Sequence, residues 1–153
     1  MEPSKLALMP FEQTALVKAA ICQLPNTGIL SQLDTGYLFL KVSDDFIHKL
    51  FPLIEISTKQ LPDYFSAVKG HIGAHVSVIY PEEIRRVQID GLLGKILYFQ
   101  KMHICQARLK EKNYLVLVIK SLELEYFRMQ QGLSKKPIYQ GFEVEFHITV
   151  ANY

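Results

Sequence analysis

Apolar and polar side chains alternate along the last twelve residues of the chain, which read FEVEFHITVANY. Successive side chains of an extended chain point to opposite faces, so this alternation predicts a half-buried strand. Its apolar face consists of Phe142, Val144, Phe146, Ile148 and Val150. The other face consists of Glu143, Glu145, His147, Thr149 and Ala151. The strand therefore buries one face and presents a histidine and a threonine together on the other.

A second strand, predicted over residues 74–80, carries the same combination of side chains. It reads AHVSVIY and ends at Pro81, which cannot donate a hydrogen bond to a strand ladder. His75 and Ser77 lie two positions apart on it, which places them on one face, about 7 Å apart along the strand. Two strands of this chain thus each present an imidazole beside a hydroxyl.

The rest of the pattern predicts a mixture of helices and further strands. Apolar positions at helical spacing predict helices within residues 11–24, 46–51 and 121–133. Apolar and β-branched runs predict strands over residues 37–42, 96–111 and 113–121, the last two as an antiparallel pair. A short helix or turn is predicted over residues 81–87, and a basic loop over residues 134–141. Both strands that carry the histidines follow a helical segment.

The length and composition indicate a single globular domain. The chain has 153 residues, of which 49% are hydrophobic and 21% are charged. Its net charge of +2 is too small to indicate binding to duplex DNA, although it suits a small anionic ligand. Cys22 and Cys105 are too few for a disulfide framework, so we expect buried free thiols in a reducing compartment. Without a membrane-spanning apolar run or a signal peptide, the chain is expected to be cytoplasmic and not bound to a membrane.

The two combinations of histidine and hydroxyl suit the hydrolysis of a phosphodiester, above all a cyclic one. The attacking water must lose a proton while the leaving ribose oxygen gains one, and two imidazoles with unperturbed pKa values of about 6.5 can do both. The hydroxyls of Ser77 and Thr149 would donate hydrogen bonds to the non-bridging oxygens, whose charge must be stabilised in the transition state. His71 and His75 are four positions apart, but metal ligands at this spacing require a helix, so we expect no metal there.

The motifs AHVSV (residues 74–78) and FHITV (residues 146–150) place H-x-[ST] between hydrophobic residues. Two such motifs on strands, separated by one intervening lobe, resemble the signature of the 2H phosphoesterase superfamily. The stretch HVSVIYPEE is similar to its small bacterial branch named Swiss Army Knife. The resemblance covers residues 35–153 as a single globular unit. It implies a bilobal α+β fold in which two small antiparallel sheets face a central cleft and helices lie outside. Residues 1–34 are expected to form an N-terminal helical extension.

The resemblance also implies roles for individual residues. His75 and His147 would be the catalytic acid and base, in an order that the sequence leaves open, and Ser77 and Thr149 would bind the substrate phosphate. Family members act on 2′,3′-cyclic nucleotides or RNA ends, on ADP-ribose cyclic phosphate, on 2′,5′-linked oligonucleotides or on RNA 3′ tails, without a metal or other cofactor. The expected partner is therefore a nucleotide or a short RNA. Tyr153 has the same parity as His147 and is a candidate for stacking on a base.

Two alternatives to an enzyme stay open. A non-catalytic nucleotide sensor would keep the same cleft, because donors that stabilise a transition state also bind a ground-state phosphate. A protein-interaction scaffold would be supported by a large apolar patch on residues 1–34. The presence of two proton-transfer groups favours the enzyme. Glu143 and Glu145 are unexplained, since a carboxylate near His147 raises the pKa of the imidazole but repels an anionic substrate.

Overall fold

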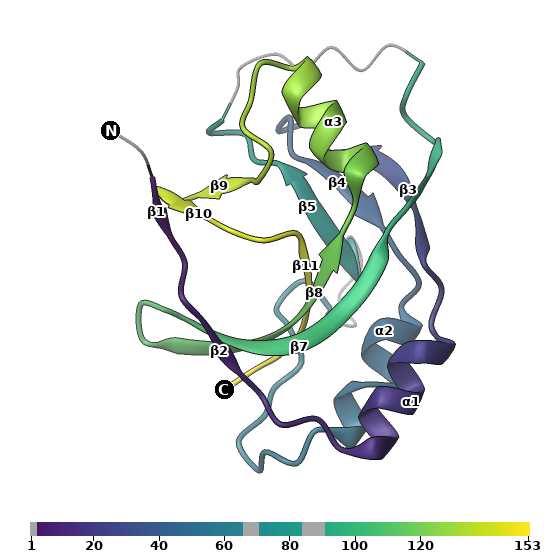
Figure 1. The fold of residues 1–153 in the computed structure, drawn as a ribbon, viewed down its shortest axis with the longest axis vertical. Helices are drawn as coiled ribbons and strands as arrows, with labels where there is room; N and C mark the ends of the chain where they lie inside the picture. The colour runs from purple at the N-terminus through teal and green to yellow at the C-terminus, as the bar shows by residue number, and fades with distance from the viewer. Residues whose placement is uncertain (1–2, 66–70, 84–90) are drawn as a thin grey trace.

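The computed structural model of the chain describes residues 3–65, 71–83 and 91–153. Across these residues, the strands form two four-stranded sheets and one three-stranded sheet, accompanied by three α-helices (Figure 1). All strand pairs are antiparallel except one in the three-stranded sheet. The predicted α+β class is confirmed.

The first four-stranded sheet contains the strand of the first histidine motif. Its order is β5-β4-β3-β6, with bounds His75–Ile79, Leu38–Lys41, Thr27–Gln32 and Ile96–Tyr98. The predicted strands over residues 37–42 and 74–80 are confirmed as β4 and β5. Strand β3 was not predicted, because Gly28 interrupts its apolar pattern. A Cβ at Gly28 would lie 2.6 Å from the Leu40 side chain, so glycine lets β3 approach β4 closely.

The second four-stranded sheet contains the strand of the second histidine motif. Its order is β11-β8-β7-β2, with bounds His147–Asn152, Lys112–Lys120, Gln100–Leu109 and Leu8–Pro10. The predicted antiparallel pair is confirmed as β7 and β8, which are joined by a turn at Lys110, whose φ is 58°. The long strand predicted over residues 96–111 is divided at Phe99. The chain passes there from β6 in one sheet to β7 in the other.

The third sheet is formed by three strands of two residues each. Its order is β1-β10-β9, with bounds Ser4–Lys5, Phe142–Glu143 and Ile138–Tyr139. The predicted basic loop thus contains β9, and the predicted closing strand is interrupted between Glu143 and His147. The first 34 residues differ from the expected helical extension, because they supply β1, β2 and β3 as well as a helix. Such short strands are defined by their partners rather than by an alternation of their own.

The described residues form three α-helices, α1 (Ala15–Gln23), α2 (Asp45–His48) and α3 (Leu122–Gln130). Two of the three, α1 and α3, begin at a residue whose side chain caps the helix. The Leu124 amide donates to the hydroxyl of Ser121 at 3.2 Å, which caps the start of α3. After α2 the chain forms a 3₁₀ turn, Phe51–Leu53, at Pro52. No helix in the described part of the chain is long and apolar enough to cross a membrane.

A single large hydrophobic core connects both four-stranded sheets with all three helices. Strands β5 and β11 contribute to it through alternate residues: Val76, Val78, Ile148 and Val150. The intervening residues of both strands are half-buried and lie on the opposite face. The predicted alternation of buried and accessible faces is therefore confirmed for both histidine strands. Of the helix or turn predicted over residues 81–87, only 81–83 are described, as a turn.

Candidate active site

A pocket of about 250 Å³ lies where β5 and β11 contact each other. His75 and Ser77 reach it from β5, and His147 and Thr149 reach it from β11. The tertiary structure thus brings the two sequence motifs, which are far apart along the chain, to one surface. All four side chains are half-buried, so they are accessible to a small ligand.

Both imidazoles are held in the same way by the backbone. Nδ1 of His75 lies 2.7 Å from the carbonyl oxygen of Gly73, and Nδ1 of His147 lies 2.7 Å from that of Glu145. A carbonyl oxygen only accepts hydrogen bonds, so each Nδ1 carries the hydrogen. In the neutral rings, Nε2 is therefore the basic nitrogen. Neither Nε2 has a hydrogen-bond partner among the residues that the structure describes, which leaves it available for proton transfer.

The two histidines differ in the charges that surround them. Burial lowers the pKa of His75 from 6.5 to about 4. The hydrogen bond to the Gly73 carbonyl opposes this shift, whereas the positive charges of His147 and Lys41 add to it. Burial also lowers the pKa of His147, but here the bond to the Glu145 carbonyl and the Glu145 carboxylate oppose the shift. Both rings are thus neutral at pH 7 in the free protein. The nearby charges favour protonation of His147 over protonation of His75.

The carboxylate of Glu145 does not act on the pocket as an isolated negative charge. Its Oε2 lies 2.5 Å from Nζ of Lys136, which also lies 3.7 Å from Glu125. The lysine partly neutralises the repulsion that Glu145 would exert on an anionic substrate. Glu143 belongs to β10 and is not among the residues that line the pocket. The basic loop thus supplies a compensating charge, a pairing that the sequence pattern did not show.

Tyrosines form a large part of the pocket and were not assigned to it from the sequence. Four of them line it: Tyr64, Tyr80, Tyr114 and Tyr139. The ring of Tyr64 packs edge-on against His75 with centroids 4.4 Å apart, and its hydroxyl donates to the backbone carbonyl of Thr149. Tyr64 therefore connects the two strands that carry the motifs. The chain has 8 tyrosines, but their spacing does not reveal which of them converge.

The hydroxyl of Ser77 lies in a small network of tyrosine hydroxyls. It forms a hydrogen bond with the Tyr37 hydroxyl, and it also lowers the pKa of Tyr80, against the larger effect of burial. The Tyr37 and Tyr80 rings stack with centroids 5.7 Å apart. Burial raises the pKa of Tyr37 to about 12 and raises that of Tyr80 as well, so both phenols keep their protons at neutral pH.

The position of Tyr153 does not support the stacking role predicted for it. The pairing of β11 with β8 shifts register between Thr149 and Ala151, which breaks the two-residue alternation. Tyr153 packs against the hydrophobic core, and its backbone pairs with that of Asn113. It is not among the residues that line the pocket. Because of the register shift, parity counted from His147 does not by itself place Tyr153 at the pocket.

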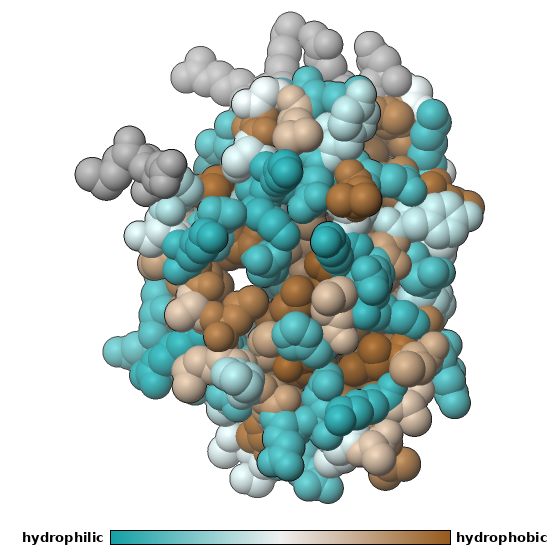
Figure 2. Space-filling view, viewed as in Figure 1, coloured by the Kyte–Doolittle hydropathy of each residue, from teal (hydrophilic) through white to brown (hydrophobic). Residues whose placement is uncertain are grey.

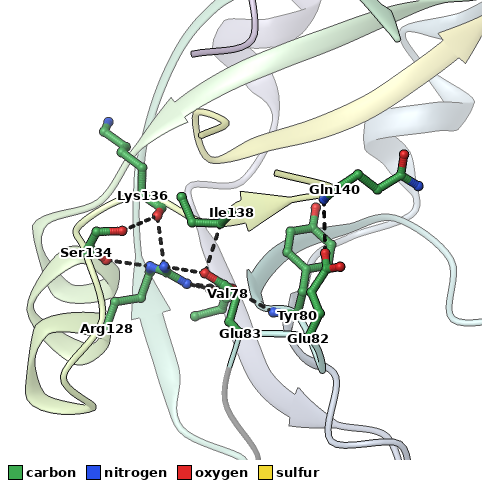
Figure 3. Close-up of polar contacts among 9 residues, drawn as sticks. All are labelled: Val78, Tyr80, Glu82, Glu83, Arg128, Ser134, Lys136, Ile138 and Gln140. Atoms are coloured by element: carbon green, nitrogen blue, oxygen red, sulfur yellow. Dashed lines mark hydrogen bonds and ion pairs between the residues drawn. The ribbon is translucent and has the colours of Figure 1, made fainter. Parts of the chain in front are cut away.

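A buried ion pair connects two of the segments that supply walls of the pocket (Figure 3). Arg128 of α3 is fully buried, and its guanidinium donates to both carboxylate oxygens of Glu83, at 2.6 and 2.9 Å. It also donates to three backbone carbonyls, those of Val78, Ser134 and Lys136. Glu83 in turn accepts from the backbone amides of Tyr80 and Ile138. The pair thus holds the end of β5 and the start of β9, next to the pocket residues Tyr80 and Tyr139.

Comparison with known proteins identifies one family. The family model described as "Swiss Army Knife, 2H phosphoesterase domain" matches residues 38–153. No curated protein and no solved structure matches the chain. The matched region includes both histidine motifs and most of the chain, but it excludes α1 and the first three strands. The chain therefore belongs to the Swiss Army Knife branch of the 2H phosphoesterase superfamily, which indicates a phosphodiesterase-type, hydrolytic activity.

Proposed function

We propose that the protein is a metal-independent phosphodiesterase that opens a 2′,3′-cyclic phosphate or cleaves a 2′,5′ linkage on a nucleotide or short RNA. The observation that supports this proposal is that both histidines and both neighbouring hydroxyl side chains line one pocket. We further propose that the fold acts as two lobes, one for each four-stranded sheet, and that the pocket is the substrate cleft between them. Support for this comes from the contact between β5 and β11, which belong to different sheets.

In the proposed reaction, the scissile phosphate lies between the two imidazoles. One Nε2 takes a proton from the attacking water, and the other imidazole, in its protonated form, gives a proton to the leaving ribose oxygen on the opposite side of phosphorus. The hydroxyls of Ser77 and Thr149 donate to the non-bridging oxygens and stabilise their charge. The bond from water oxygen to phosphorus forms as the bond to the ribose oxygen breaks. No step requires another cofactor.

The local charges favour His75 as the base and His147 as the acid. Lys41 lowers the pKa of His75, whereas Glu145 opposes the lowering for His147. When the two imidazoles hold one additional proton between them, that proton would thus reside on His147. A bound phosphodiester anion raises both pKa values, because it stabilises the charged imidazolium. Substrate binding therefore supplies the protonated acid that the free protein lacks at neutral pH.

The test of the proposal is turnover in the presence of a chelator. Purified protein is incubated with 2′,3′-cyclic nucleotides, 2′,5′-linked oligoadenylates and short RNAs that end in a cyclic phosphate, and the products are separated by chromatography. Turnover that survives the chelator supports a metal-independent enzyme. Turnover that the chelator abolishes contradicts metal independence. Binding of these ligands without turnover would identify the alternative, a nucleotide sensor with the same fold.

The lowered pKa values predict an acidic optimum for kcat/KM. The base must be unprotonated, and His75 is unprotonated above about pH 4. The acid must be protonated, and His147 loses its proton as the pH rises through its pKa, which lies below 6.5. We expect kcat/KM to peak below pH 6.5 and then to fall about tenfold per pH unit. The maximum of kcat should lie at higher pH, because bound phosphate raises both pKa values. Initial rates measured at constant ionic strength check this, and a kcat/KM maximum well above neutrality would contradict it.

The Tyr37 hydroxyl is expected to act through Ser77. Tyr37 keeps its proton at neutral pH, so its hydroxyl can donate to the Ser77 oxygen and leave the Ser77 hydrogen free for the phosphate. Tyr37→Phe should lower kcat/KM by about fivefold, the value of one neutral hydrogen bond. In a Ser77→Ala background the same change should have no further effect. The matched control is Thr149→Ala, in which Tyr37→Phe should keep its full effect, and equal effects in both backgrounds would contradict the prediction.

A further inference from the structure

The pocket has two chemically different ends. The histidines and their neighbouring hydroxyls occupy the end formed by β5 and β11. The wall farther from β5 is aliphatic and is formed by Val116 and Val118 of β8, Ala107 and Leu109 of β7, and Leu6 and Leu8 near the N-terminus. A ligand whose phosphate lies between the imidazoles would thus place an adjacent group against hydrocarbon.

The change from polar to apolar side chains along the pocket follows from the strand register of the sheet that contains β11. Residues opposite each other on neighbouring strands lie side by side on the same face. His147 and Thr149 of β11 lie opposite Val118 and Val116 of β8. The apolar surface continues onto β7 and β2, where Ala107 lies opposite Leu8. Val116 and Val118 belong to a second hydrophobic cluster, separate from the main core, and Leu8 packs against it.

The N-terminal segment closes this apolar end of the pocket. Strand β1 pairs in parallel with β10, and the Leu6 amide then donates to the Glu143 carbonyl at 3.0 Å. Strand β2 pairs next with β7, so the segment runs from the three-stranded sheet to the four-stranded sheet (Figure 1). Hydrophobic side chains surround a hollow beside this segment (Figure 2). Leu6 and Leu8 lie outside the matched residues 38–153, so the family match does not cover the part of the wall that these two leucines form.

We propose that this pocket selects a phosphodiester with one compact, largely nonpolar substituent and no second phosphate, and that Leu6 and Leu8 set the size of that substituent. The proposal rests on the proposed function and narrows its substrate to the size of a mononucleotide. The volume of about 250 Å³ lies just below the range of about 300–1,000 Å³ that is usual for small-molecule sites. Of the described residues that line the pocket, none is Lys or Arg. A second phosphate held inside this pocket would lose its hydration without gaining a cationic partner, because Lys110 and Lys112, next to Leu109, line a neighbouring hollow instead.

The experiment compares substrates that share one reacting group. These are a 2′,3′-cyclic mononucleotide, a trinucleotide that ends in the same cyclic phosphate, and ribose 2′,3′-cyclic phosphate without a base. For the wild type we expect kcat/KM on the mononucleotide to exceed both other values by at least about tenfold, because the base buries apolar surface and the trinucleotide adds unpaired charge. Equal values for the mononucleotide and the trinucleotide would overturn the proposal while leaving the proposed function intact.

Leu8 and its neighbour Met9 provide a matched pair of variants. Leu8 lines the pocket, whereas Met9 is the next residue of β2 and its side chain is 59% exposed. Leu8→Ala, or Leu6→Ala, should reduce the preference for the mononucleotide over the trinucleotide at least threefold, and Met9→Ala should leave it unchanged. Unfolding temperatures show whether each variant is folded. An unchanged preference in folded Leu8→Ala and Leu6→Ala variants would overturn the role of these leucines.

Failure of the proposed function gives a different result. If the wild type turns over none of the three substrates, the proposed activity is wrong. Selectivity is then measured as binding, by calorimetry with the 2′-phosphorylated mononucleotide and the corresponding trinucleotide. Tighter binding of the mononucleotide, weakened by Leu8→Ala but not by Met9→Ala, would still support the apolar pocket as a selective site. Equal binding of both ligands would overturn it.

Discussion

His75→Asn and His147→Asn should each lower kcat/KM by about 10³-fold and leave the fold intact, because general acid–base catalysis contributes about 10²–10⁴ to the rate. Asparagine is the informative replacement here. Its side-chain amide can still donate to the carbonyl of Gly73 or Glu145, as Nδ1 now does, but it cannot transfer a proton. The double variant should be little worse than either single variant, since the two groups act in one reaction.

The residual activities should identify which histidine is the base. With His75 as base, His75→Asn should remove the acidic limb of the kcat/KM profile, and His147→Asn should remove the alkaline limb. The reverse pattern would exchange the two roles. His103→Asn is the control, because His103 is an exposed residue of β7 that does not line the pocket. Near-wild-type activity in either active-site variant would contradict two-histidine catalysis.

Arg128→Met is expected to lower the free energy of unfolding by about 3–5 kcal/mol, because it leaves the carboxylate of Glu83 buried without its cation. All five guanidinium N–H donors find acceptors in the native structure, either in Glu83 or in backbone carbonyls. At about 2–4 °C per kcal/mol for a chain of this size, the unfolding temperature should fall by roughly 10 °C. Urea unfolding followed by circular dichroism measures the change.

A surface ion pair provides the control for this prediction. Lys49 lies 3.7 Å from Asp45 and both side chains are about half exposed, so Lys49→Met should change stability by less than about 1 kcal/mol. The double variant Arg128→Met with Glu83→Gln should be more stable than Arg128→Met alone, because it no longer buries an unpaired charge. A loss below about 1 kcal/mol for Arg128→Met would show that the pair does not stabilise the fold in this way.

The histidine strands could be predicted because their signal is local. In an extended chain, residues two apart share a face whatever the partner strand is, so the alternation itself assigns His75 with Ser77 and His147 with Thr149. Helix α3 and the antiparallel pair of β7 and β8 were predictable because their signals are also local. Strands β1 and β2 were not, since each is short and pairs with a strand far along the chain. Strand β9 has only two residues, and Gly28 interrupts the apolar pattern of β3.

Several features of the site depended on contacts that no local pattern contains. Tyr64 lies in a segment without a clear period, yet its ring packs on His75 and its hydroxyl reaches the backbone of β11. From the sequence, the carboxylate of Glu145 beside His147 was expected to repel an anionic substrate. In the structure Lys136 pairs with this carboxylate and partly neutralises its charge. The sequence placed Tyr153 on the same face as His147. In the structure β11 shifts register after Thr149, and Tyr153 packs against the hydrophobic core.

The sequence by itself determined which side chains share a face within each strand, because the two-residue period belongs to the extended backbone. From the two motifs it also identified the superfamily. Only the tertiary structure decided that the two strands meet at one pocket, that burial lowers both imidazole pKa values, and that the N-terminal segment supplies part of an apolar wall. Burial and proximity arise from packing between segments far apart in the chain, which the period of a single segment does not encode.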